Sequence, residues 1–289
     1  MPETVLTVRE ALQRAAAWLA QRGIAAARLD AELLLADVLQ LRRLDLYLQL
    51  DRPLASAERD AYRQALQRRA RGEPVQYIGG RAAFRSLMLA VDRRVLIPRP
   101  ETEQLVERVL RWARGRPDMT AVDIGTGSGA IALSLACEGP FVRVVGTDVS
   151  ADALAVAQAN AAAVQPLVPL EWRQGDLFAP LAGEVFDVVV SNPPYVDPAA
   201  AATLPPEVRD WEPPVALFAP DGGRGVLRAL VAQAPAHLRP GGLLALEIGE
   251  DQGAEVRAWL EASGAFAWAR IEQDWTGRDR YALAERAGP

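Results

Sequence analysis

The stretch that decides the fold is Asp123–Gly129, which reads D-I-G-T-G-S-G. It continues a short apolar run that starts at Thr120, and it leads into a segment with helical character, Ser128–Cys137. A glycine-rich turn between a strand and a helix is typical of nucleotide-binding folds. Its three glycines let the backbone turn tightly and let a ligand approach where a Cβ would intrude. The amides at the start of the helix then face that ligand. The stretch predicts a cofactor-binding turn in an α/β fold.

A carboxylate follows this turn at the spacing that nucleotide-binding folds use. Asp148 comes directly after the next strand candidate, Phe141–Thr147, and 23 residues after Gly125. A carboxylate at this point can accept hydrogen bonds from both hydroxyls of a ribose. Gly125, Gly127 and Ala130 also satisfy the G-x-G-x-x-A form of nicotinamide-cofactor sites. The turn by itself therefore leaves adenosylmethionine and a dinucleotide open.

Strand and helix candidates alternate around the turn and on to the C-terminus. The strand-like runs are Thr120–Ile124, Phe141–Thr147, Leu170–Arg173, Phe186–Ser191 and Leu243–Ile248, followed by two further candidates. Helical segments lie between them, among them Ala151–Ala163 and Gly225–Leu238. This alternation favours an α/β fold with a doubly wound, mostly parallel, seven-stranded sheet and helices on both faces.

The first seventy residues read as helices only. Thr7 and Glu10 form a capping-box pattern, Leu29–Leu39 carries an apolar stripe, and Ser56 is suited to cap a third helix that ends near Gly72. We expect three parts: an N-terminal helical bundle over residues 1–72, a β-hairpin linker over 73–98, and a catalytic domain over 99–289. The bundle has no catalytic constellation of its own, so we expect it to recognise the substrate.

The composition argues against a DNA-binding, disulfide-bonded or zinc-binding protein. The net charge is −5, whereas a duplex-DNA binder usually presents a basic face. The arginines at positions 68, 69 and 71 are expected to form a solvated helix end. One cysteine, Cys137, and one histidine, His237, make a disulfide or a structural zinc site improbable. We interpret Cys137 as a small core residue and His237 as a solvated or capping residue at a helix end.

Nothing in the sequence indicates a membrane or secreted protein. No apolar run approaches the roughly 20 residues that cross a bilayer, and no secretory signal is visible. We therefore expect a cytoplasmic, metal-free protein.

The most specific pattern is Asn192-Pro193-Pro194-Tyr195, directly after the strand candidate that ends at Ser191. Two prolines fix the backbone and remove two donors, so their carbonyl groups stay free to accept. Asparagine adds a carbonyl acceptor, and tyrosine adds a flat apolar face. Together these groups can grip a planar group that carries an NH2. Polarising both N–H bonds and aligning the nitrogen with a methyl–sulfur bond would activate a poor nucleophile.

With these residues in view, the chain resembles the release factor glutamine methyltransferases, the HemK/PrmC family of class I S-adenosylmethionine-dependent methyltransferases. The Asn-Pro-Pro-Tyr tetrad alone is shared with DNA methyltransferases that act on adenine or cytosine amines. Further stretches resemble the release-factor family: P-V-Q-Y-I-G at 74–79, V-L-I-P-R-P-E-T-E at 95–103, E-I-G-E-D-Q-G at 247–253 and G-R-D-R at 277–280. The resemblance covers the chain from about residue 70 to the end.

The resemblance implies S-adenosylmethionine as the cofactor. Its expected binding residues are Gly125, Thr126, Gly127, Ser128, Gly129, Asp148, Leu177 and Asn192. Asp123 would lie near the sulfonium and methionine end, and Pro98–Thr102 would line that end. Asp176 and Leu177 fall where the family contacts adenine. Many members have an aromatic residue at the second of these positions, so leucine implies an apolar contact in place of stacking.

The resemblance also implies the acceptor. Asn192, Pro193, Pro194 and Tyr195 would hold the glutamine of the Gly-Gly-Gln loop in class 1 peptide chain release factors, and its side-chain amide nitrogen would receive the methyl group. The expected partner is thus a release factor, with no direct nucleic-acid binding, no membrane and a monomeric enzyme. Two other functions stay open: a DNA amino-methyltransferase, and a non-enzymatic module that only binds the cofactor.

Overall fold

The computed structural model describes residues 6–288 and divides the chain into two compact units. A helical unit contains the chain up to Gly80 together with Pro205–Trp211, and a sheet unit contains Arg81–Leu204 and Glu212–Pro289. The sequence pattern instead drew the first boundary at residue 72 and assigned residues 205–211 to the catalytic domain. No helix within residues 6–288 has the length and apolar character that a bilayer span requires.

The helical unit is built from short helices around one apolar core. They are α1 (Val8–Ala20), α2 (Ala27–Leu39), η1 (Arg43–Leu48), α3 (Ser56–Ala70), α4 (Val75–Gly79) and α8 (Pro206–Arg209). The capping box of α1 is confirmed: Thr7 Oγ1 accepts from the Glu10 amide at 3.3 Å, and the Glu10 carboxylate accepts from the Thr7 amide at 3.1 Å.

Ser56 does not cap α3, contrary to the expectation. The helix begins at Ser56 itself, and the capping position is Ala55. The Glu58 carboxylate accepts from the Ala55 amide at 2.8 Å and from Arg52 at 2.6 Å. A longer side chain from inside the first turn thus satisfies the amide at the start of the helix.

The arginine cluster near the end of α3 is not simply solvated. Arg69 is 6% exposed and pairs with Asp30 of α2 and Glu207 of α8, each at 2.6 Å. Arg68 pairs with Glu73, also at 2.6 Å. A buried guanidinium needs such partners because its desolvation is costly. The cluster therefore holds the helical unit together, and the Arg69–Glu207 pair ties α8 to α3.

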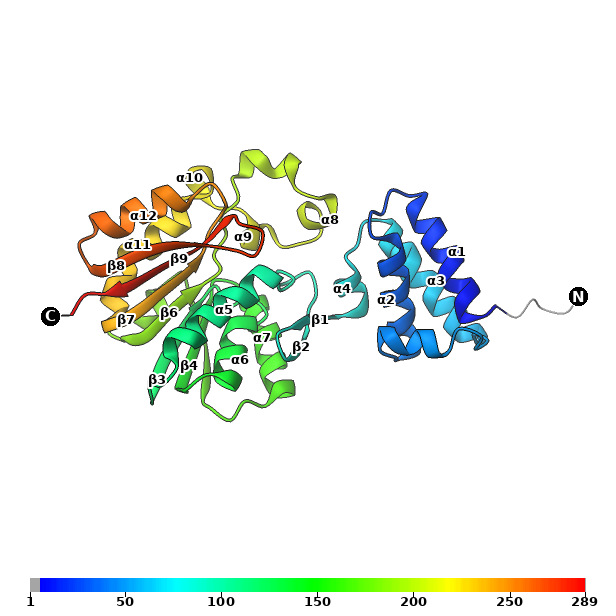
Figure 1. Ribbon diagram of the computed structural model, residues 1–289, viewed down its shortest axis with the longest axis horizontal. Helices are drawn as coiled ribbons and strands as arrows, with labels where there is room; N and C mark the ends of the chain where they lie inside the picture. The colour runs from blue at the N-terminus through cyan, green and yellow to red at the C-terminus, as the bar shows by residue number, and fades with distance from the viewer. Residues whose placement is uncertain (1–5, 289) are drawn as a thin grey trace, which may run out of the picture. The chain divides into compact units, whose positions relative to one another are not determined.

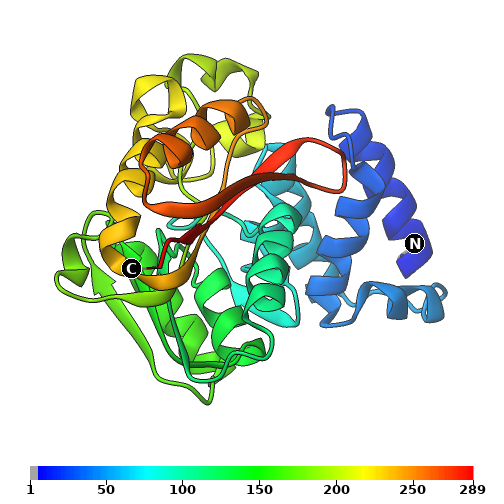
Figure 2. The same ribbon diagram turned by 60° about the vertical axis from the view of Figure 1, so that its left-hand side comes forward.

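The sheet unit contains the predicted seven-stranded sheet, in the order β5-β4-β3-β6-β7-β9-β8. Its strands are β3 (Met119–Ile124), β4 (Phe141–Asp148), β5 (Leu170–Gln174), β6 (Phe186–Ser191), β7 (Leu238–Glu247), β8 (Phe266–Gln273) and β9 (Asp279–Arg286). The first five are parallel, and β9 runs antiparallel to β7 and β8. Figure 2 shows β8 and β9 as the orange and red pair at one edge.

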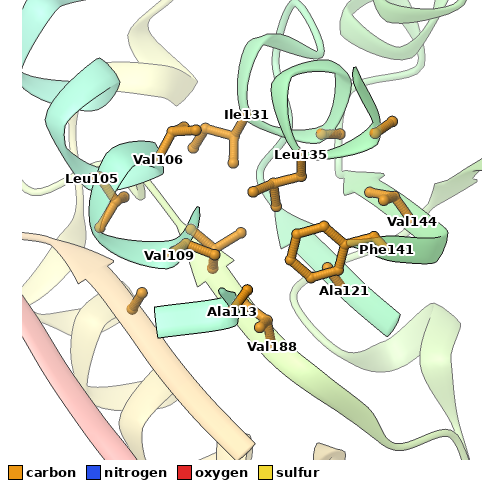
Figure 3. Packing of buried hydrophobic residues seen from close by; sticks show 14 of the residues in the cluster. Leu105, Val106, Val109, Ala113, Ala121, Ile131, Leu135, Phe141, Val144 and Val188 are labelled. Atoms are coloured by element: carbon orange, nitrogen blue, oxygen red, sulfur yellow. The ribbon is translucent and has the colours of Figure 1, made fainter. Parts of the chain in front are cut away.

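Helices cover both faces of this sheet (Figure 1). On one face lie α5 (Pro100–Ala113), α6 (Ala130–Glu138) and α7 (Ala151–Val164), and on the other α11 (Gly225–His237) and α12 (Gly253–Ala262). The shorter elements are η2 (Ala179–Leu181), η3 (Pro198–Thr203), α9 (Pro214–Leu217) and α10 (Pro220–Gly223). In Figure 3, Val106 of α5 lies beside Ile131 of α6, and Val109 lies toward Leu135 of α6 and Phe141 of β4. The doubly wound architecture is confirmed.

The hairpin of β1 (Arg81–Phe84) and β2 (Leu87–Ala90) is part of the sheet unit and not a free linker. Phe84 and Leu89 are fully buried in the core on the α5–α6 face. Asn160 of α7 accepts from the Ala90 amide at 2.7 Å and donates to the Ala90 carbonyl at 3.0 Å. The hairpin thus packs as a further layer over the sheet unit's own helices.

Candidate active site

Three parallel strands end side by side at one edge of the sheet. Ile124 at the end of β3 pairs with Thr147 of β4 and with Ser191 of β6. The Ser191 hydroxyl donates to the Ile124 carbonyl at 2.6 Å, which ties two of the ends together. From β3 the chain order runs to β4 on one side and to β6 on the other. Such a switch point is where doubly wound folds bind ligands.

A cavity of about 250 Å³ opens at this switch point. Of the residues predicted for the site, Gly125–Ser128, Asp148, Leu177 and Asn192–Pro194 line it. Pro98, Arg99 and Thr102, from the stretch expected at the methionine end, line it as well. Gly129 and Tyr195 are not among the lining residues. The cofactor turn and the tetrad therefore share one hollow.

Gly129 packs against the protein interior at the end of the glycine turn and not against the cavity. Its φ of 82° lies in the left-handed region, and a Cβ there would come within 3.0 Å of the Trp172 ring and 3.3 Å of Ala157. Only glycine combines this conformation with so close an approach. Gly129 thereby sets where α6 begins and how its first turn faces the cavity.

Asp148 lies at the cavity wall with both carboxylate oxygens held by backbone amides. Gly127 donates to Oδ2 and Ser150 donates to Oδ1, both at 2.9 Å. Burial raises the pKa of this carboxyl above its usual value, and the amides oppose that rise. A carboxylate has about four acceptor positions, so these oxygens can still accept from a ligand's hydroxyls.

Asp123, which was expected near the sulfonium and methionine end of the cofactor, has a side chain that is completely buried beneath the glycine turn and does not line the cavity. Oδ2 accepts from the Thr126 hydroxyl at 2.6 Å and from the Ala132 amide at 3.2 Å. Burial raises the pKa of Asp123 to about 7. Because its bonds run to the turn and to the first turn of α6, Asp123 fixes the shape of the glycine turn.

Leu177 lines the cavity beside Asp176, in an unusual conformation. Its φ is 48°, in the left-handed region that a branched side chain seldom adopts. The neighbouring Phe178 is buried and stacks on His237 with ring centroids 4.6 Å apart, which anchors the segment. Leu177 thereby contributes apolar surface to the cavity wall.

The environments of His237 and Cys137 differ from those expected from the sequence. His237 is not simply solvated: besides the Phe178 contact, its Nδ1 lies 3.0 Å from the Glu184 carbonyl oxygen. Cys137 is exposed near the end of α6 and does not lie in the core. No three histidine, cysteine or acidic residues come together as a metal site among residues 6–288.

The tetrad is braced by a hydrogen-bond chain that the sequence pattern did not reveal. Asn192 Nδ2 donates to Thr102 Oγ1 at 2.9 Å, and the Thr102 hydroxyl donates to Glu247 Oε2 at 2.7 Å. The Tyr195 hydroxyl donates to Glu247 Oε1 at 3.2 Å. The tyrosine ring packs against the core on the α11–α12 face. Thr102 and Glu247 occur in the family-like stretches, but no spacing rule links residues so far apart.

Another carboxylate missed by the sequence reasoning secures the loop before α5. Glu212 is 3% exposed, accepts from the Ile97 amide at 3.2 Å and pairs closely with Arg99. No periodic pattern around Glu212 signalled this contact. It holds Arg99 at the cavity wall.

Comparisons with known proteins agree with this geometry. Residues 10–80 match the family described as the PrmC N-terminal domain, and residues 102–204 match the methyltransferase small domain. The release factor glutamine methyltransferase of Moorella thermoacetica is 45% identical over 281 residues, covering 97% of this chain and 99% of that protein. Its counterpart from Chlorobaculum tepidum is also 45% identical, with 97% and 98% coverage.

Among solved structures, the T. thermophilus 16S rRNA N2 G1207 methyltransferase in complex with AdoMet and guanosine has a TM-score of 0.52. It is 21% identical, and the match covers 71% of this chain and 49% of that one. That likeness supports the methyltransferase fold of the sheet unit. The curated relatives match nearly end to end and carry one common name. On this identity and coverage, the chain belongs to the release factor glutamine methyltransferase family.

Proposed function

We propose that the protein transfers a methyl group from S-adenosylmethionine to the side-chain amide nitrogen of the glutamine in the Gly-Gly-Gln loop of class 1 peptide chain release factors. The observation that carries the proposal is that the glycine turn, Asp148 and Asn192 line one cavity at the switch point. The name shared by the family's members supports the same acceptor.

The residues at the cavity fit adenosylmethionine. Asp148 keeps acceptor positions for the two ribose hydroxyls, and Leu177 offers apolar surface to the adenine. The amides of the glycine turn and the wall near Pro98 are available to the methionine end. When bound, adenosylmethionine supplies a methyl group on a sulfonium, which is a good leaving group.

Asn192 and Pro193 would bind the acceptor amide. Asn192 Nδ2 donates to Thr102, and Asn192 Oδ1 accepts no hydrogen bond from any of residues 6–288. This oxygen and the Pro193 carbonyl can accept the two N–H bonds of the glutamine side chain. Held in this way, the nitrogen would be aligned to accept the methyl group from the sulfonium, with the sulfur leaving as a neutral thioether and the displaced proton passing to solvent. Orientation and polarisation supply the rate, and no metal step is invoked.

The helical unit is proposed to provide a second contact with the folded release factor. Gly-Gly-Gln is too short to bury much surface, so a second contact would raise the effective concentration of the glutamine at Asn192. The enzyme is proposed to act as a monomer in the cytoplasm without binding nucleic acid directly. A DNA amino-methyltransferase would need basic side chains that are free to bind phosphates. In the arginine cluster of α3, Arg68 and Arg69 are instead paired with carboxylates of this chain.

The acceptor class is tested by methyl transfer from labelled adenosylmethionine. Purified release factor and duplex DNA are offered to the enzyme separately and in competition. We expect label in the release factor alone, and a release factor with alanine in place of the loop glutamine should take up none. Label in DNA, or undiminished label in that alanine variant, contradicts the proposed function.

A further inference from the structure

Both ends of the Asn192–Tyr195 tetrad are tied to one buried carboxylate. Glu247, the last residue of β7, is 1% exposed. One of its oxygens accepts from Thr102, which in turn accepts from Asn192, and the other accepts from Tyr195. Thr102 lies in the first turn of α5 and is itself 5% exposed. Helix α5, strand β7 and the segment after β6 are thus joined at the tetrad.

We propose that Glu247 is a positioning residue of the methyl-transfer site, which fixes the Asn192 carboxamide through Thr102 and the Tyr195 hydroxyl directly. This inference rests on the proposed function, because it assigns Asn192 Oδ1 to the acceptor amide. Glu247 does not line the cavity and acts only through its two partners.

Counting protons shows why the carboxylate determines which end of Asn192 faces the cavity. An ionised carboxylate can only accept, so the single proton of the Thr102 hydroxyl is donated to Glu247. The Thr102 oxygen can then only accept from Asn192, which requires the NH2 end of the carboxamide. Oδ1 is left as an acceptor for the glutamine of the release factor. With Asn192 turned over, two NH2 groups would oppose each other and transfer would fail.

Protonation of Glu247 removes this constraint. A neutral carboxyl can donate to Thr102, whose proton is then free to point at Asn192, so both orientations of the carboxamide become allowed. Burial, with a smaller contribution from the charge of Glu101 of α5, raises the pKa of Glu247 to about 7. Hydrogen bonds from Thr102 and Tyr195 and the charge of Arg280 on β9 oppose this rise in pKa. Tyr281, the next residue of β9, is the strand partner of Glu247. The ionised, orienting form therefore prevails above about pH 7, and methyl transfer should become faster as the pH rises through that value.

The first test compares single-turnover methyl transfer in Thr102→Val, Thr102→Ser and Ser134→Ala. Valine keeps the shape of threonine and loses the hydroxyl, serine keeps the hydroxyl, and Ser134 supplies a matched buried hydroxyl away from the cavity. We expect the valine variant to lose about tenfold or more in rate, since a mispositioned acceptor loses its stabilisation of the reacting group. The serine variant should recover most of the rate that valine loses, the Ser134→Ala variant should stay within about twofold of the parent, and adenosylmethionine affinity should change far less than the rate. A valine variant that binds adenosylmethionine and transfers within twofold overturns the inference.

The second test is the pH profile of the same rate in Glu247→Gln. Glutamine cannot titrate, so the part of the rise near pH 7 that Glu247 causes should be lost, while any part that Asp123 of the glycine turn causes remains in both proteins. A variant whose rate rises through pH 7 as much as the parent's overturns the inference. If Glu247→Gln does not fold, the threonine pair decides the question.

The third measurement does not depend on activity, so it separates this inference from the proposed function. In a ¹⁵N spectrum of the whole enzyme, the side-chain amide protons of Asn192, assigned by their loss in Asn192→Asp, should exchange more slowly with solvent than in Thr102→Val. Equal exchange in the two proteins overturns the orientation by Thr102 and Glu247. An enzyme with the slow exchange and no transfer to release factor would contradict only the proposed function.

Discussion

At the scale of single residues, polar side chains in the cavity wall already accept hydrogen bonds from the protein's own backbone amides. Asp148 illustrates this, since Gly127 and Ser150 each hold one of its oxygens toward the cavity. The amides fix the carboxylate in place before any ligand arrives. Pre-organisation of this kind lowers the ordering cost of binding.

We expect Asp148→Ala to weaken adenosylmethionine binding at least about tenfold, because hydrogen bonds to a charged group contribute about 1.5–3 kcal/mol each. Isothermal titration calorimetry measures the change. Asp152→Ala, which removes an exposed carboxylate from the first turn of α7, is the control and should leave the affinity unchanged. Equal affinity in Asp148→Ala and the parent would show that the ribose is bound elsewhere.

Asn192→Ala removes the acceptor itself. Losing one such polar contact to a reacting group typically lowers the rate about 10²–10³-fold, and rapid-quench single-turnover kinetics on release factor should show a loss of that size. Thermal unfolding of the variant checks that the fold is intact. A folded variant that keeps most of the parent's rate would rule out the proposed role of Asn192.

At the scale of elements, the hairpin of β1 and β2 contributes to the stability of the sheet unit. Leu89 and Met88 are adjacent on β2, but Leu89 is fully buried whereas Met88 is 57% exposed. Leu89→Ala should therefore lower the free energy of unfolding by about 2–5 kcal/mol through the lost burial and the cavity left behind. Met88→Ala should change it by less than about 0.5 kcal/mol. Urea denaturation compares them, and equal effects would mean that the hairpin is only a linker.

The elements also show what the sequence can and cannot predict. Parallel strands buried on both faces are continuous apolar runs, so β3 and β6 could be located within a residue or so, and the residues just after them were predicted as site residues. The packing of the hairpin could not be predicted from the sequence, because nothing in its two short strands indicates which helices they contact. Nor could the link from Thr102 to Glu247, which joins residues 145 positions apart through one hydroxyl.

At the scale of the whole molecule, the helical unit carries two exposed leucines on one short helix. Leu44 and Leu48 on η1 are 69% and 84% exposed. Exposed apolar groups gathered on one element are typical of protein–protein contacts. Point substitutions on η1 test recognition better than a deletion of residues 1–72, because the deletion would also remove Arg69, the partner of Glu207.

The double variant Leu44→Ser/Leu48→Ser should lower kcat/KM on intact release factor by about tenfold or more, since buried interface anchors commonly contribute over 1 kcal/mol each. Its weak activity on an isolated Gly-Gly-Gln peptide should not change. Leu167→Ser, at a fully exposed leucine of the sheet unit, is the matched control and should behave like the parent. If the double variant modifies intact release factor as well as the parent does, η1 makes no contact with the substrate.

The central claim is that the cavity at the switch point delivers a methyl group to one amide nitrogen. The most direct measurement is tandem mass spectrometry of release factor after incubation with the enzyme and adenosylmethionine. We predict one added methyl group, with fragment ions that locate it on the side-chain nitrogen of the Gly-Gly-Gln glutamine, and none with Asn192→Ala over the same time. A methyl group on another residue, or an unmodified release factor alongside an enzyme that binds adenosylmethionine, would contradict the claim.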